Sequence, residues 1–130
     1  MPKSLSLLFV VDKATGKYVL FVDPDDMLKP ETCEKLYAIA KDRRCDILQF
    51  GVEILETGNR TEKQRAVSAA YFNPKPAEVR GRDILTAAYL EHKLPINVIF
   101  RLFSTKLVRA AFKNIPDVFS VNETDVYAFF

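Results

Sequence analysis

The chain has 130 residues, of which 48% are apolar and 28% are charged, and its formal net charge is +2. This length and composition fit one compact globular domain with a substantial core. The small net charge, and the absence of a basic stripe with interleaved aromatic residues, argue against nucleic acid as a partner.

Two apolar runs near the start of the chain predict strands. Leu5–Val11 and Tyr18–Val22 have the length and the β-branched and aromatic content of strands. Tyr18–Val22 does not alternate with polar residues, so both of its faces should be buried, as in the central strand of a helix-covered sheet. Between the two runs, Asp12–Lys17 is expected to form a turn.

A helix and a different kind of strand follow. Pro30 and Glu31 suit a first helical turn, and the helix is predicted to end near Arg43. Its apolar positions recur at the spacing of one helix face: Cys33, Leu36, Tyr37 and Ala40. Asp46–Ile54 alternates between apolar and polar residues, which predicts a half-exposed strand at a sheet edge.

The rest of the chain is predicted to contain a loop, helices and one short strand. Glu56–Arg65 is polar and Phe72–Glu78 contains two prolines, so residues 57–80 are expected to form a loop. Helices are predicted at Asp83–Glu91, from the N-cap Ser104 to Phe112, and from the N-cap Asn122 onward, with a short strand at Asn97–Phe103.

Three acidic residues, Asp23, Asp25 and Asp26, directly follow the predicted strand Tyr18–Val22. The carboxyl end of a strand is where open α/β sheets bind ligands. Pro24 favours an extended Asp23, so Asp23 and Asp25 are expected to point to the same side. Such hard oxygen ligands suit a Mg²⁺ or Mn²⁺ ion that bridges to a substrate phosphate. Asp-Pro-Asp-Asp is also an ordinary turn sequence, and both interpretations stay open at this point.

The segment Ala14–Gly51 resembles the family 2 glycosyltransferases. It contains, in the order and at the spacing of that family, a Gly-Lys-Tyr strand, an Asp-x-Asp-Asp motif, a helix that starts at a proline, and a strand that begins Asp-Ile. The resemblance continues more weakly over Gly81–Phe130. It implies the α/β fold called GT-A, in which a mixed sheet is flanked by helices.

The resemblance implies transfer of a sugar from a nucleotide-diphosphate donor to a hydroxyl group of a saccharide or glycoconjugate acceptor, as in polysaccharide biosynthesis. Asp23 and Asp25 match the DxD motif and would hold Mg²⁺ or Mn²⁺ against the donor diphosphate, with Asp25 as the more direct ligand. The metal would neutralise the charge that develops on the leaving nucleotide. Asp23 and Asp26 would also support donor binding, Asp26 through hydrogen bonds.

Three further residues become site candidates by the same resemblance. Asp125 is the candidate general base for the acceptor hydroxyl, and Glu123 is a weaker candidate. Acids at this place also suit the first turn of a helix. Arg101 stands where relatives often carry a basic residue, and is a weak candidate for a phosphate contact. A solvated or salt-bridged arginine is the simpler interpretation, and the tryptophan that relatives carry nearby is absent.

We expect a single partial glycosyltransferase domain over residues 1–130, truncated at its N-terminus. Residues 1–13 are an atypical first segment, 14–56 the βαβ unit with the DxD motif, 57–80 a loop, and 81–130 the acceptor side. Because the nucleotide-binding first part of such domains has no counterpart here, the isolated chain is not expected to be active. The alternatives are a non-catalytic remnant that acts as a binding module, and a generic α/β domain whose acids only form a turn.

Location and association are inferred from what the sequence lacks. Lys3 and the short apolar run after it do not make a complete signal peptide, and no stretch has the ~20 apolar residues of a membrane span. A cytoplasmic location, with association at the inner face of the membrane, is therefore expected. Cys33 and Cys45 lack metal-site spacing and are expected to be reduced, with a disulfide as the alternative. Apolar surface uncovered by the missing part favours self-association.

Overall fold

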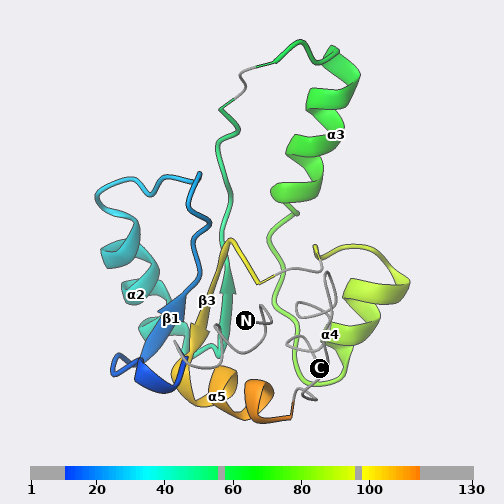
Figure 1. The fold of residues 1–130 in the computed structure, drawn as a ribbon. Helices are drawn as coiled ribbons and strands as arrows, with labels where there is room; N and C mark the ends of the chain where they lie inside the picture. Colours follow the sequence, from blue (N-terminus) through cyan, green and yellow to red (C-terminus); the bar gives the residue numbers. More distant parts are fainter. Residues whose placement is uncertain (1–10, 56–57, 96–97, 115–130) are drawn as a thin grey trace. The chain divides into compact units, whose positions relative to one another are not determined.

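The computed structural model describes residues 11–55, 58–95 and 98–114. By its contacts the chain divides into two compact units. The first unit comprises Met1–Gln49 and Asn97–Phe130, and the second comprises Phe50–Ile96. The fold is α/β, with one small sheet and several helices (Figure 1).

The first unit is built around a three-stranded antiparallel sheet in the order β1-β3-β2. The strands are β1 (Tyr18–Leu20), β2 (Ile47–Gln49) and β3 (Arg101–Ser104). Val19 of β1 lies opposite Phe103, and Leu48 of β2 lies opposite Leu102. Since β3 is antiparallel to both neighbours, β1 and β2 run in the same direction, with β3 between them (Figure 1).

The prediction of a central strand at Tyr18–Val22 is wrong in position. β1 ends at Leu20 and lies at an edge of the sheet with its residues half-buried, whereas the first three residues of the central strand β3 are buried. A continuous apolar run signals burial of both faces, but it does not distinguish a central strand from a covered edge strand. Here the run continues to Phe21, whose ring packs edge-on against Phe103 at 6.1 Å between centroids.

Strand β2 is shorter than the predicted strand Asp46–Ile54. Its pairing with β3 ends at Gln49, opposite Arg101, which is the first residue of β3. Beyond Gln49 the described residues offer no partner strand, so the ladder stops there although the alternating pattern continues. Both pairings in the described part of the chain are antiparallel, so the expected mixed sheet is not seen there.

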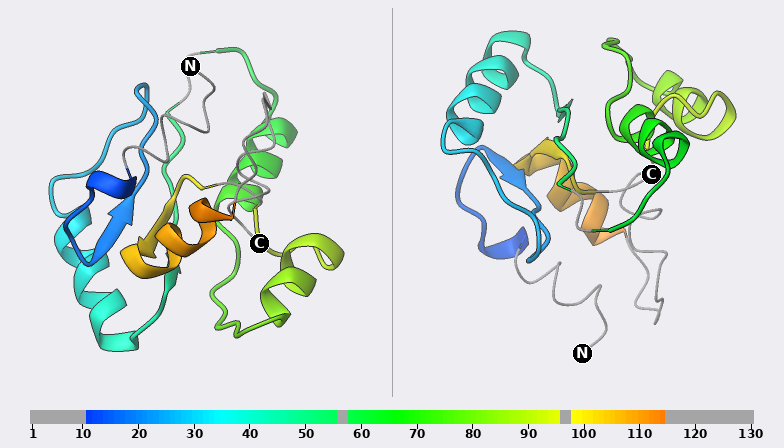
Figure 2. Two further views of the ribbon diagram at one scale, coloured as in Figure 1. Left: turned by 60° about the horizontal axis from the view of Figure 1, so that its bottom comes forward. Right: turned by 90° about the horizontal axis from the view of Figure 1, so that it is seen from above.

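Helix α2 (Thr32–Arg43) confirms the amphipathic helix predicted from the spacing of its apolar residues. Two of those residues, Leu36 and Ala40, are buried. A third, Tyr37, meets the ring of Tyr18 edge-on at 6.0 Å between centroids, so the helix lies beside β1 (Figure 2). The fourth, Cys33, is exposed, so the predicted face is packed over only part of its length.

Helix α5 (Thr105–Lys113) follows β3 directly and completes the core of the first unit. Ser104 is its N-cap, as predicted: the hydroxyl accepts the Leu107 backbone N–H at 3.3 Å and donates to the Asp46 carboxylate at 2.7 Å. One side chain therefore joins the start of α5 to the start of β2. The buried core consists of Val11, Val98, Phe103, Val108 and Phe112.

Two predicted elements lie wholly or mostly outside the described residues. Of the strand predicted at Leu5–Val11, only Val11 is described, and it is helical together with residues 12–13. Val11 is fully buried in the core. The helix predicted from Asn122 onward lies outside the described residues altogether.

The second unit contains a helix that was not predicted from the sequence. Helix α3 (Glu62–Phe72) lies within the predicted loop over residues 57–80, so that prediction is wrong. None of the helix residues is buried, and the segment lacks a regular apolar face. It begins at a capping box, in which Thr61 and Gln64 each accept the other's backbone N–H. This helix is therefore identified by the cap at its start and not by a buried apolar face.

The helix predicted at Asp83–Glu91 is confirmed. It consists of α4 (Asp83–Leu85), which continues into a π-helical turn, η1 (Thr86–Leu90). Elsewhere in this unit, Asn73 pairs with the backbone of Val52. Its Oδ1 accepts the Val52 N–H at 2.7 Å and its Nδ2 donates to the Val52 carbonyl at 3.1 Å. An amide side chain thus pairs with the backbone of Val52 as a neighbouring strand would.

Candidate functional site

The three clustered acids lie in a tight turn that follows β1. The Asp26 backbone N–H donates to the Asp23 carbonyl at 3.0 Å, which closes a turn with Pro24 at its second position. The fixed φ of proline suits that position. The turn interpretation is therefore correct for the backbone. It does not compete with ligand binding, because the closing hydrogen bond uses no carboxylate.

The turn gathers three carboxylates in one place. One oxygen from each of Asp23, Asp25 and Asp26 lies within 4.8 Å of the others, and all three residues are exposed. Oxygen ligands at this spacing can share one Mg²⁺ or Mn²⁺ ion and leave its other positions open to water or phosphate. The chemistry and the geometry of the cluster therefore fit the divalent cation that the DxD pattern implies.

The surroundings of the cluster raise the pKa of one of these acids. The pKa of Asp26 is raised, first by partial loss of hydration and then by the charges of Asp25 and Asp23. A raised pKa means that the ionised carboxylate is disfavoured, first because it has lost hydration and then because like charges at short range repel each other. A divalent cation would offset this repulsion, so the crowded cluster gains more from a cation than isolated carboxylates would.

Arg101 lies at the same end of the sheet as the acid cluster. Leu102 is opposite Leu20, so Arg101 stands one step further toward the segment that leads to Asp23. The residue is only 2% exposed, and its Nε donates to Oε1 of Gln49 at 3.0 Å. The interpretation of Arg101 as a solvated arginine is therefore wrong. A buried guanidinium needs hydrogen-bond partners of this kind.

Gln49 is a neighbour of the candidate site that sequence reasoning missed. It ends β2 directly opposite Arg101 in the register of the sheet. The alternating pattern placed it on the polar face of a strand, but the pairing depends on a residue far away in the sequence. No local signal identifies such a pair.

The candidate bases Asp125 and Glu123 lie outside the described residues, so their catalytic role stays a prediction. Cys33 and Cys45 are both free thiols. None of the helices in the described part of the chain has the length and apolar character needed to cross a membrane.

Comparison with known proteins gives one positive result. The model of a family described as Glycosyl transferase family 2 matches residues 3–115. The match covers most of the chain, including the acid cluster and all three strands. It also includes residues 3–13, which belong to the segment predicted to be atypical. No curated protein and no solved structure matches the chain.

Proposed function

The chain belongs to glycosyl transferase family 2, and we propose that it acts in the transfer of a sugar from a nucleotide-diphosphate donor to the hydroxyl group of a saccharide or glycoconjugate acceptor. Family membership implies the GT-A fold and nucleotide-sugar chemistry, and the α/β character of the structure agrees with that fold. The acid cluster carries the proposal, because Asp23, Asp25 and Asp26 bring carboxylate oxygens within 4.8 Å of one another after β1.

Each residue at this end of the sheet has a distinct role in the proposal. Asp23 and Asp25 would hold Mg²⁺ or Mn²⁺, with Asp25 as the more direct ligand, and Asp26 would support the donor through hydrogen bonds. When bound, such a cation would neutralise negative charge on the donor diphosphate. Arg101 orders the neighbouring strand ends through its hydrogen bond to Gln49. The phosphate contact that the family resemblance implies for Arg101 stays a prediction.

Asp125 is proposed as the general base, with Glu123 as the second candidate. The base takes the proton of the acceptor hydroxyl while the acceptor oxygen bonds to the sugar and the nucleotide diphosphate departs with the electron pair of the broken bond. We propose polysaccharide or glycoconjugate biosynthesis in the cytoplasm as the setting, since nucleotide sugars are supplied there. That the chain corresponds to the later part of a glycosyltransferase domain also stays a prediction.

Cation binding tests the proposal directly. Mn²⁺ is titrated by calorimetry into the metal-stripped protein, alone and with a panel of nucleoside diphosphates. We expect Asp25→Ala to weaken Mn²⁺ binding by about tenfold or more, because even the loss of a residue that only orients a metal ligand costs about that much. Asp42→Ala removes an exposed acid of α2 and is the matched control; it should bind Mn²⁺ as the unaltered chain does.

The outcomes separate the candidate functions. A nucleoside diphosphate that strengthens Mn²⁺ binding by the unaltered chain but not by Asp25→Ala supports a working donor site. Cation binding without any effect of nucleotide favours the alternative, a non-catalytic binding module that retains the acid cluster. Equal Mn²⁺ affinity in all three proteins, each shown to be folded by circular dichroism, would overturn the cation site itself.

A further inference from the structure

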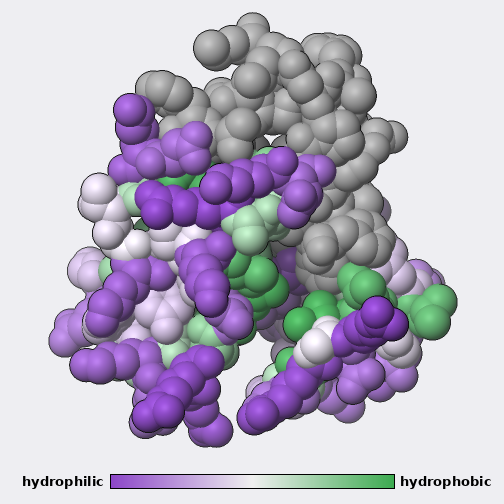
Figure 3. All heavy atoms as spheres, turned by 90° about the horizontal axis from the view of Figure 1, so that it is seen from below, coloured by the Kyte–Doolittle hydropathy of each residue, from purple (hydrophilic) through white to green (hydrophobic). Residues whose placement is uncertain are grey.

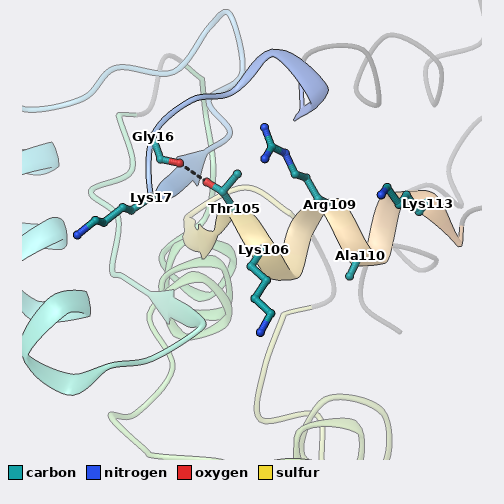
Figure 4. Close-up of a pocket in the computed structure, with 7 residues that line it drawn as sticks. All are labelled: Gly16, Lys17, Thr105, Lys106, Arg109, Ala110 and Lys113. Carbon is teal, nitrogen blue, oxygen red and sulfur yellow. Dashed lines mark hydrogen bonds between the residues drawn. The ribbon is translucent and has the colours of Figure 1, made fainter.

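A shallow depression of about 580 Å³ lies in the first unit between the turn that precedes β1 and helix α5 (Figure 4). Gly16 and Lys17 line it from the turn, and the other lining residues belong to the helix. The two segments are far apart in the sequence and meet because β1 pairs with β3, which leads directly into α5. A volume of this size falls in the range of about 300–1,000 Å³ that small-molecule sites occupy.

Hydrogen bonds hold the two walls of the depression together. The Thr105 hydroxyl donates to the Gly16 carbonyl at 2.6 Å (Figure 4). The Thr105 backbone N–H donates to the Lys17 carbonyl at 2.9 Å. Further along the helix, Arg109 Nη2 donates to the Ala14 carbonyl at 2.6 Å. The depression is therefore formed before any ligand arrives, which lowers the entropic cost of binding.

The depression is strongly basic. Four of its lining residues, Lys17, Lys106, Arg109 and Lys113, are cations, and none of the lining residues is acidic. In the two segments that form it, residues 11–17 and 105–114, Asp12 is the single acid. Lys17 and Lys106 extend in different directions from the two walls (Figure 4). Seen from below, most of the described surface is hydrophilic, with smaller hydrophobic areas between the hydrophilic side chains (Figure 3).

This depression is separate from the acid cluster. Lys17 immediately precedes β1, and Asp23 follows its other end, so the two sites lie at opposite ends of the strand. An extended segment of this length spans about 20 Å, which is beyond the reach of a lysine side chain. A diphosphate held by a cation on Asp23 and Asp25 therefore does not contact the cations of the depression.

We propose that the depression binds a ligand through a phosphate or diphosphate group, at a site independent of the proposed cation site. Several cations around one fixed hollow suit a ligand with more than one negative charge. They suit a ligand with a single carboxylate less well. Arginine and lysine together are suited to phosphate oxygens, since the guanidinium donates at defined angles and ammonium groups adjust around it. The phosphate can belong to a soluble compound or to a lipid headgroup, and the experiment distinguishes these two sources.

The test uses the whole chain in buffer with EDTA, so that no cation is bound to the acids. In one arm, pyrophosphate is titrated in by calorimetry. In the other arm, binding to phosphatidylcholine vesicles is measured with and without phosphatidylglycerol. The test variant is Lys106→Ala with Lys113→Ala, which leaves Arg109 and its structural hydrogen bond in place. The control is Lys41→Ala with Arg43→Ala, which removes the same charge from exposed positions of α2.

We expect the test variant to bind pyrophosphate about tenfold more weakly or worse, since each charge-assisted hydrogen bond contributes on that order. The control, and Asp25→Ala, should bind it as the unaltered chain does, which makes the result independent of the proposed glycosyl transfer. Binding only to anionic vesicles, abolished in the test variant but not in the control, would support the proposal with a lipid headgroup as the source. No binding in either arm, or equal weakening by both double variants, would overturn it.

Discussion

Arg101 is a charged residue placed inside a sheet, and its surroundings explain how the sheet tolerates it. The residue is 2% exposed, and Gln49 across the strand pair accepts its Nε–H at 3.0 Å. We expect Arg101→Ala to lower the free energy of unfolding by about 1–3 kcal/mol, because it leaves the Gln49 carbonyl oxygen without its donor. Urea unfolding followed by circular dichroism measures this.

The control for this substitution is Arg43→Ala, which alters an exposed arginine at the end of α2 and should change the free energy of unfolding by less than about 0.5 kcal/mol. If both substitutions had the same small effect on unfolding, while Arg101→Ala alone weakened nucleotide binding, Arg101 would be a ligand contact rather than a structural residue.

At the scale of elements, Ser104 connects β3, α5 and β2. It ends β3, caps α5 by accepting the Leu107 N–H, and donates to Asp46, which directly precedes β2. We expect Ser104→Ala to lower the free energy of unfolding by about 1 kcal/mol or somewhat more, since loss of an N-cap typically costs that amount. Ser104→Thr keeps the hydroxyl and should retain most of the stability. If Ser104→Ala and Ser104→Thr lowered the free energy of unfolding by the same amount in urea, the hydroxyl would contribute nothing to stability.

At the scale of the molecule, helices of the two units differ in burial, and α5 and α3 are the extremes. In the first unit, β3 and α5 contribute buried residues to one core, including Phe103 and Phe112. In the second unit, α3 has no buried residue. Because local opening is easiest where little apolar surface is buried, we expect backbone amides of α3 to exchange with deuterium at least about tenfold faster than those of β3. Protection of α3 equal to that of β3 would contradict this expectation.

Self-association also belongs to the scale of the molecule. Some large apolar side chains are well exposed, among them Met27 at 78% and Leu90 at 77%. Scattered exposed apolar residues are common on monomeric proteins, whereas a contiguous patch favours association. The self-association predicted from the sequence therefore stays a prediction.

The sequence by itself determined what depends on neighbours along the chain. The periodic apolar residues of α2, the N-cap Ser104 and the turn around Pro24 were predicted because helix faces, caps and turns are decided within a few residues. The three acids after β1 lie together for the same reason, because they are neighbours in the sequence. The family match agrees with the pattern around them. The capping box at Thr61, which begins α3, is a local signal of the same kind that did not enter the prediction.

Only the tertiary structure decided which distant segments meet. β3 lies between β1 and β2, and the pairings place residue 103 opposite residues 19 and 47. In this strand order β1, which was predicted to be central, is an edge strand of the described sheet. The Gln49–Arg101 pair and the basic depression between Lys17 and α5 arise in the same way. Strand order and register depend on packing between segments far apart in the chain, and hydrophobic periodicity within one segment carries no information about its partner.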